Sequence, residues 1–340
     1  MSALIAMDET RLAALVKECG QPSFRAKQLR EYALKGTAVE EMSSLPKAMR
    51  EALVEKGVTA LAASIVQSKT SAIDGTTKFL FALEDGNVVE GVLMKYDYGN
   101  SVCVSTQVGC AMGCKFCAST LDGKVRDLTA AEMLSEVIAA GSAVGGVNHV
   151  VLMGSGEPLD NYDEVIEFIR RLCVDLGMSK RHIALSTCGL CEAMDRLSKE
   201  EYAPVLTVSL HAPNDELRKR IMPIANKYPV RDVVAAAKRY FDSTSRRVIF
   251  EYSLIDGFND TGECVKELAA LVKGFPCHVN LIRLNPVKER GLAGSDKAAV
   301  AAFSDALTAR GVSNTVRRTL GADIDGACGQ LRRKFLGGGK

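Results

Sequence analysis

VGCAMGCKFCAST, residues 108–120, places Cys110, Cys114 and Cys117 at positions i, i+4 and i+7 of a glycine-containing loop. The loop follows SVCVS, residues 101–105, which has the pattern of a strand. Three thiols at this spacing can converge on one centre, and thiolates are ligands of iron–sulfur clusters and of zinc. A structural zinc takes four ligands, and no neighbouring Cys or His is an obvious fourth. A 4Fe-4S cluster with three protein ligands and one open iron is therefore favoured over a zinc loop with a distant fourth ligand.

Strand-like and helix-like segments alternate after this loop. The strand-like runs are SVCVS, NHVVLM, HIALST, PVLTVSL, RVIFEYSL and HVNLIRL, and helix-length segments lie between most of them. This alternation predicts an α/β fold made of parallel β/α units. Six strands suit a partial (β/α)6 barrel, although periodicity alone does not separate it from a doubly wound sheet. In either fold, ligands gather at the carboxyl ends of the strands.

The N-terminal part has a different pattern. Asp8 can cap a first short helix, and further helices are expected at 23–35 and 46–56. KFLFAL and VVEGVLMKY then flank an Asp-Gly-Asn turn and predict a β-hairpin. We therefore expect a helical accessory domain at 1–70, a β-hairpin extension at 71–100, the barrel at 101–318 and a C-terminal tail at 319–340.

Composition sets broad limits. The chain has 340 residues, 47% of them apolar, so it can fill a sizeable core, and its net charge of +2 does not announce a nucleic-acid partner. The eleven cysteines are not spaced like a secreted disulfide framework. With neither a membrane-length apolar run nor a signal-peptide pattern in the sequence, we expect a cytoplasmic protein with no membrane partner.

Polar and glycine residues lie where the predicted strands end. Gly156 and Glu157 belong to the GSGEP turn after NHVVLM, where glycine lets a ligand approach the backbone and a carboxylate can accept from an ammonium group. Five further positions fall on the same edge: Ser186, the run Ser209-Leu210-His211, and Asn285. Taken singly, each is more readily a cap or a satisfied buried polar group, but together with the cysteine loop they form one rim.

The CxxxCxxC loop, with Phe116 before the last cysteine, resembles the signature of the radical S-adenosylmethionine (SAM) superfamily, and GSGEP fits its GGEP-like motif. The resemblance implies that SAM chelates the open iron and that reduction yields a 5′-deoxyadenosyl radical. More specifically, GNSVCVSTQVGCAMGCKFCAST, GSGEPLDN, SLHAPNDELR, NLIRLNP and GADIDGACGQLR resemble the RlmN/Cfr family of RNA adenosine methyltransferases. These stretches run from about Thr76 to Arg333.

This family resemblance implies roles for three more residues. Cys328 would receive a methyl group from one SAM, and the radical from a second SAM would take hydrogen from that S-methyl group so that the carbon adds to adenine. After loss of the ring proton, Cys103 would attack Cys328, which releases the RNA and leaves a transient disulfide. Glu90 matches a proposed proton acceptor, with Cys103 as its rival. An exposed strand carboxylate is the alternative interpretation of Glu90.

The family also implies partners: 23S rRNA near the peptidyl transferase centre, transfer RNA at the anticodon loop, and a low-potential electron donor such as flavodoxin. We expect a monomer. Basic residues that could contact phosphate are Arg25, Lys27, Arg30 and Lys35 in the second helix and Arg317, Arg318, Arg332 and Arg333 around the tail. We expect methylation at carbon 2 of adenine.

Three alternatives stay open: Cfr-type methylation at carbon 8, a radical SAM activase of a protein or small molecule, and a non-enzymatic iron–sulfur or zinc protein. The chain departs from the family pattern at Ser155, Cys188 and Arg283, where Met, Ser and Pro are usual. These departures bear on the fine positioning of substrate, and Cys188 could be an extra oxidisable thiol.

Overall fold

The computed structural model describes residues 3–326, residue 330 and the backbone of residues 334–335. Its helices are α1 (Glu9–Glu18), α2 (Arg25–Leu34), α3 (Lys47–Glu55), α4 (Ala130–Ser142), α5 (Tyr162–Val174), α6 (Cys191–Leu197), α7 (Asp215–Ile221), α8 (Val230–Thr244), α9 (Gly262–Leu271) and α10 (Lys297–Thr308). Its strands are β1 (Ala63–Thr70), β2 (Thr77–Leu83), β3 (Asn87–Tyr96), β4 (Gly99–Cys103), β5 (Gln107–Gly109), β6 (Lys124–Asp127), β7 (His149–Leu152), β8 (Ile183–Thr187), β9 (Val205–Ser209), β10 (Val248–Leu254), β11 (Cys277–Arg283), β12 (Asn314–Val316) and β13 (Lys334–Phe335).

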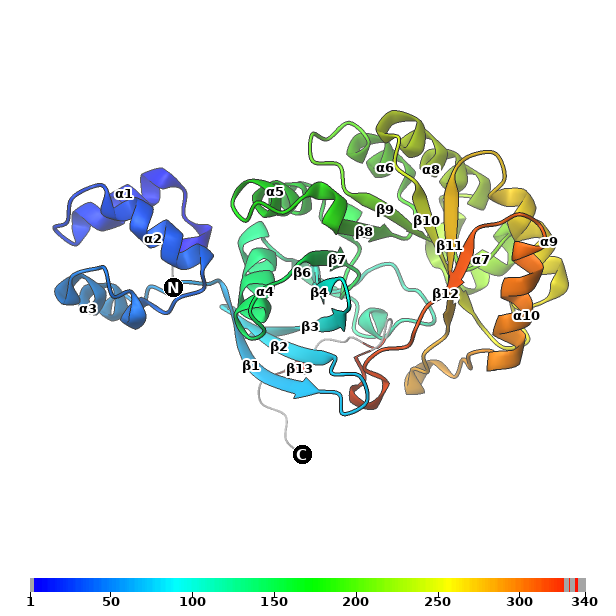
Figure 1. The fold of residues 1–340 in the computed structure, drawn as a ribbon, viewed down its shortest axis with the longest axis horizontal. Coiled ribbons are helices and arrows are strands. Elements are labelled where there is room, and N and C mark those ends of the chain that lie inside the picture. The colour runs from blue at the N-terminus through cyan, green and yellow to red at the C-terminus, as the bar shows by residue number, and fades with distance from the viewer. Residues whose placement is uncertain (1–2, 327–329, 331–333, 336–340) are drawn as a thin grey trace.

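A parallel sheet wrapped by helices forms the body of the molecule. Neighbouring strands run in the order β4-β7-β8-β9-β10-β11-β12, and each of these pairs is parallel. All six predicted strands are confirmed, and β12 is a seventh that the sequence analysis missed. The sheet does not close, because β4 continues into antiparallel strands on its other side. The α/β fold with a partial barrel is thus confirmed (Figure 1).

An antiparallel extension continues the same sheet beyond β4. The hairpin of β2 and β3 forms as predicted, with Gly86 at φ 81 in its turn. β1 adds to the outer edge of β2, and β13 pairs with the start of β3. The helical region therefore ends earlier than the sequence indicated, because residues 63–70 belong to the sheet.

Helices α1–α3 form a separate lobe at the far side of the extension (Figure 1). Asp8 caps α1 as predicted, since its carboxylate accepts from the backbone N–H of Arg11 at 2.8 Å. Arg30 pairs with Asp175, just after α5, at 2.8 Å between Nη2 and Oδ2. This expected phosphate contact thus attaches the lobe to the barrel.

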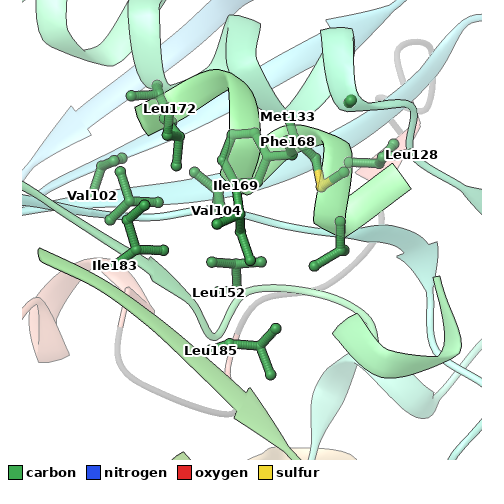
Figure 2. Close-up of a cluster of buried hydrophobic side chains, with 14 of the residues drawn as sticks. Val102, Val104, Leu128, Met133, Leu152, Phe168, Ile169, Leu172, Ile183 and Leu185 are labelled. Carbon is green, nitrogen blue, oxygen red and sulfur yellow. The ribbon is translucent and has the colours of Figure 1, made fainter. Parts of the chain in front are cut away.

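The core lies between the sheet and its outer helices. Val102 and Val104, Leu152, and Ile183 and Leu185 project from the β4, β7 and β8 segments against Phe168, Ile169 and Leu172 of α5 (Figure 2). Each of these eight residues is at most 1% exposed. Burying a side chain of this size contributes about 1.5–3 kcal/mol, which fixes these strand ends and the loops that follow them. Among the described residues, no helix is long and apolar enough to cross a membrane.

Candidate functional site

A cavity of about 150 Å³ opens beside the carboxyl ends of the parallel strands. The three cysteines of the CxxxCxxC loop line it together with most of the predicted rim, namely Gly156, Glu157, Ser186, Ser209, His211 and Asn285. Residues up to 175 positions apart in sequence thus meet in one place, because parallel strands bring their carboxyl ends to one edge of the sheet. The predicted rim therefore exists as a single site.

Backbone contacts hold the cysteine loop over this cavity. The N–H of Cys110 donates to the carbonyl of Gly123 at 3.1 Å, and the N–H of Lys115 donates to the carbonyl of Ile221 at 2.8 Å. The Thr120 hydroxyl lies 3.0 Å from the carbonyls of both Cys114 and Cys117. Both ends of the loop are fixed, which limits the entropy lost when a ligand binds.

The donor set suits an iron–sulfur cluster, because the three thiols of Cys110, Cys114 and Cys117 line one cavity and thiolates are the usual ligands of such clusters. Burial raises the pKa of the Cys110 thiol to about 12, and burial also raises the pKa of Cys114. Bound iron would reverse this by favouring the thiolates.

The glycine turn after β7 packs directly on the strand that leads into the cysteine loop. Gly156 has φ 111, and a Cβ there would lie 2.7 Å from both the Thr106 hydroxyl and the Gln107 Cβ. The Glu157 carboxylate is buried and accepts from the N–H groups of Cys188, at 2.8 Å, and Leu159, at 3.1 Å. Burial raises its pKa. Glu157 thus ties the turns after β7 and β8 together at the cavity wall.

We expect Gly156→Ala to destabilise the protein much more than Gly177→Ala. Both glycines have positive φ, but a Cβ at Gly177 would meet nothing within 4 Å. Gly177→Ala should therefore cost about 1 kcal/mol through backbone strain alone. Gly156→Ala adds overpacking against the cysteine strand, so its total cost should be about 3 kcal/mol. Denaturant unfolding of both variants measures this, and equal losses would contradict the predicted contact.

Of the other rim residues, Ser186, Ser209 and His211 line the cavity, whereas Leu210 does not. The hydroxyls of Ser186 and Ser209 lie 3.4 Å apart in the cavity wall. His211 is buried at φ 55, and its Nδ1 accepts from the N–H of Ser253 at 2.9 Å, which leaves the proton on Nε2. Burial lowers its pKa to about 3, so the ring is neutral. Leu210, by contrast, is fully buried in the core and is not among the cavity-lining residues.

A second cavity of about 40 Å³ adjoins the first and contains Cys103. Met153, Ile282, Asn285 and Arg317 line both cavities. Cys103 is 6% exposed at the end of β4, and residues 317–320 and Gly326 also line this cavity. The predicted disulfide partner of Cys103, Cys328, lies outside the described residues.

Glu90 is not the exposed strand carboxylate of the alternative interpretation, because it is only 1% exposed. Its carboxylate pairs with Lys78 at 3.2 Å, and Glu90 lines neither cavity. Arg317 also differs from expectation, since it faces the cavities and lies 3.4 Å from the carboxylate of Glu251. Arg318 is exposed as expected, while Arg332 and Arg333 lie outside the described residues.

The sequence analysis missed Arg218, a fully buried arginine under the site. Its guanidinium donates to four carbonyls, of Cys188 at 2.6 Å, Leu210 at 3.1 Å, Ser209 at 3.3 Å and Tyr228 at 3.4 Å. Three of these acceptors lie at the end of β9 or directly after β8 and β9, and two of them, Cys188 and Ser209, line the cavity. An arginine in the charged run DELRKR gives no signal of this, because such runs are usually solvated.

The three departures from the family pattern occupy different surroundings. Ser155 is buried, and its carbonyl accepts from Thr106 and Gln107. Cys188 lines the main cavity and packs in a cluster with Cys114. The Arg283 side chain donates to the carbonyl of Ser295 and does not line the cavity. Of the three, Cys188 alone contributes a side chain to the cavity.

Comparisons with known proteins agree with this geometry. Residues 104–272 match the model of the radical SAM superfamily. A probable dual-specificity RNA methyltransferase RlmN from Lachnospira eligens is 46% identical, over 99% of this chain and 97% of that protein. One from Clostridium perfringens is 48% identical over 94% of both chains. The crystal structure of a radical SAM methyltransferase from Sphaerobacter thermophilus superposes with a TM-score of 0.91 at 39% identity, covering 97% of this chain and 99% of that one. The chain therefore belongs to the RlmN family of radical SAM RNA methyltransferases.

Proposed function

We propose that this enzyme methylates carbon 2 of one adenosine in 23S rRNA and of an adenosine in the anticodon loop of transfer RNA. The supporting observation is the pair of adjoining cavities, one lined by Cys110, Cys114 and Cys117 and the other by Cys103. The names of the similar proteins, dual-specificity RNA methyltransferases, support an RNA substrate of more than one kind. The adenine would be extruded from a folded loop to reach the cavities.

Cys110, Cys114 and Cys117 would hold the 4Fe-4S cluster, and SAM would lie against the rim residues Gly156, Glu157, Ser186, Ser209, His211 and Asn285. When bound, the cluster and SAM supply a 5′-deoxyadenosyl radical on reduction by a low-potential donor such as flavodoxin. Glu157 and the neutral ring of His211 would orient the SAM amine and ribose, because both are held by backbone hydrogen bonds. Leu210 would contribute through its backbone position only.

The methyl group would travel through the protein before it reaches RNA. The Cys328 thiolate would take it from a first SAM by displacement, since carbon 2 of adenine has no lone pair with which to attack a methyl group. Described residues on both sides of Cys328 lie at or near the Cys103 cavity. Gly326 lines the Cys103 cavity, and the Gln330 side chain donates to the carbonyl of Pro286, next to Asn285, at 3.2 Å.

Cys103 would then release the product. After the methylene carbon has added to adenine, the adduct would lose one electron, which the cluster when bound can take up, and its ring proton would pass to Glu90 or to Cys103. Cys103, as the thiolate, would then attack the Cys328 sulfur and break the bond between that sulfur and the methylene carbon, which takes a proton to become the methyl group. This frees the methylated RNA and leaves a disulfide that cellular thiols or a dithiol protein reduce again. A reducing cytoplasm and a monomeric enzyme fit this cycle.

A Cys328→Ala variant tests the proposal. We expect it to bind RNA and to retain the cluster, yet to lose all RNA methylation, because the methyl carrier is gone. Nucleoside mass spectrometry of 23S rRNA and transfer RNA from cells that express each protein is the measurement. Retained methylation in Cys328→Ala would overturn the mechanism, and 8-methyladenosine as the wild-type product would establish the Cfr-type alternative.

A further inference from the structure

The segment that precedes Cys328 is held against the β1–β2 turn. The N–H of Gly321 donates to the Asp74 carboxylate at 2.9 Å, and the N–H of Ala72 donates to the Asp323 carboxylate at 3.2 Å. These reciprocal contacts join residues about 250 positions apart in sequence. The antiparallel extension thus has a second role beyond lengthening the sheet, because it anchors residues 321–326.

The third contact comes from Lys78 on β2. Its Nζ donates to the carbonyl of Asp325 at 3.0 Å and pairs with the Glu90 carboxylate at 3.2 Å. The Lys78 side chain is 9% exposed and that of Glu90 is fully buried. A buried ammonium group without acceptors strongly destabilises a protein. Lys78 therefore favours the arrangement in which the Asp325 carbonyl and the Glu90 carboxylate both stay in place.

Asp325 itself adopts a conformation that needs support. Its φ of 52 places it in the left-handed region, which non-glycine residues other than Asn and Asp rarely enter. The hydrogen bond from Lys78 to its carbonyl is made in this conformation. The next residue, Gly326, already lines the Cys103 cavity.

The sheet register shows where this arrangement leads. Lys78 on β2 pairs with Val92 on β3, and Val92 pairs with Cys103 on β4. Paired residues project from the same face, so Lys78 and Cys103 lie in one row, two strands or about 10 Å apart. Residues 325 and 326 lie along this row: the carbonyl of Asp325 contacts Lys78, and Gly326 lines the Cys103 cavity.

We propose that Lys78 is a positioning residue: it holds residues 321–326 in place so that Cys328, which follows them, is presented to SAM and to Cys103. This rests on the proposed role of Cys328. The Lys78–Glu90 ion pair acts through the Asp325 carbonyl, and Asp74 is a second anchor of the same segment.

Lys78→Met keeps most of the aliphatic length but removes the charge, and Lys69→Met is its matched control. Lys69 is the residue paired with Lys78 on β1, but it is exposed. Hydrogen–deuterium exchange of the full-length protein without cluster or SAM should rise about tenfold or more at residues 321–326 in Lys78→Met, as expected when a charged donor is lost. Lys69→Met should leave this exchange unchanged.

The functional readout is the methyl group on Cys328, measured by peptide mass spectrometry after the reconstituted enzyme reacts with methyl-labelled SAM. Lys78→Met should lower this methylation about tenfold or more, because misplacement of a reacting group by about 1 Å costs that much or more. Unchanged exchange at 321–326, or unchanged Cys328 methylation, would overturn the role of Lys78.

Two further outcomes are distinguishable. In the first, wild-type Cys328 carries no methyl group while exchange at 321–326 still depends on Lys78. The proposed function then fails, and so does the role of Lys78 in presenting Cys328, although Lys78 still anchors residues 321–326. If exchange rises across the whole barrel in Lys78→Met, Asp74→Ala decides. Asp74→Ala should raise exchange locally and lower Cys328 methylation, and a local rise with full methylation would overturn the proposal.

Discussion

Cys114→Ala is expected to abolish cluster assembly and therefore all methylation of RNA. The three cysteines of the CxxxCxxC loop line one cavity, and Cys114 is buried in an apolar cluster with Cys188, Ile221 and Met222. Removing one of three thiolates leaves a cluster with two protein ligands, which a protein site rarely retains. Iron and sulfide analysis after anaerobic reconstitution, with the visible absorption of the cluster, measures the loss.

Cys188→Ser is the matched control for this prediction. Cys188 is equally buried and lines the same cavity, but it is not part of the CxxxCxxC loop. We expect Cys188→Ser to assemble the cluster with the wild-type iron content. Equal loss of iron in both variants would show that Cys188 is itself a ligand, and full iron content in Cys114→Ala would exclude the assigned ligand set. Zinc in place of iron in the wild-type protein would revive the zinc interpretation.

The parts of this structure that local sequence patterns encode were predictable. Six parallel strands, the hairpin of β2 and β3 and the cysteine loop follow from periodicity, turn residues and spacing. β12 was missed because three residues carry no readable alternation. Leu210 was placed on the rim with Ser209 and His211 because it follows the same strand, but its side chain is buried in the core and does not line the cavity. Position at a strand end alone does not show which way a side chain points.

Contacts between distant positions could not be predicted in the same way. Arg30 looked like a phosphate ligand, but its pairing with Asp175 depends on how the helical lobe docks. Likewise, Lys78 and Glu90 are twelve positions apart in sequence. Which charged side chains of the antiparallel extension become buried depends on the path of residues 321–326, which contact Lys78. A periodic pattern shows which face of an element is apolar, but not which polar side chain will meet a particular carbonyl from elsewhere in the chain.

Arg218→Met is expected to cause the largest loss of stability of any substitution considered. The guanidinium is fully buried and serves four backbone carbonyls, those of Cys188, Ser209, Leu210 and Tyr228. Methionine fills part of the volume but donates no hydrogen bond, so the four carbonyls lose their buried donor. Each carbonyl that water cannot reach then destabilises the protein by about 1–3 kcal/mol. Allowing for the removed cost of burying a charge, the net loss should be about 3–5 kcal/mol.

Lys219→Met separates this effect from a general sensitivity of α7. Lys219 is the next residue on the same helix and is exposed, so its replacement should change the unfolding free energy by no more than about 0.5 kcal/mol. Denaturant unfolding of both variants provides the comparison, and equal stability would contradict the role of Arg218. Where Arg218→Met still folds, its SAM affinity should also fall, because three of the released carbonyls belong to the turns that carry Cys188 and Ser209 into the cavity wall. A loss of affinity without a loss of stability would instead mean that Arg218 acts on the cofactor alone.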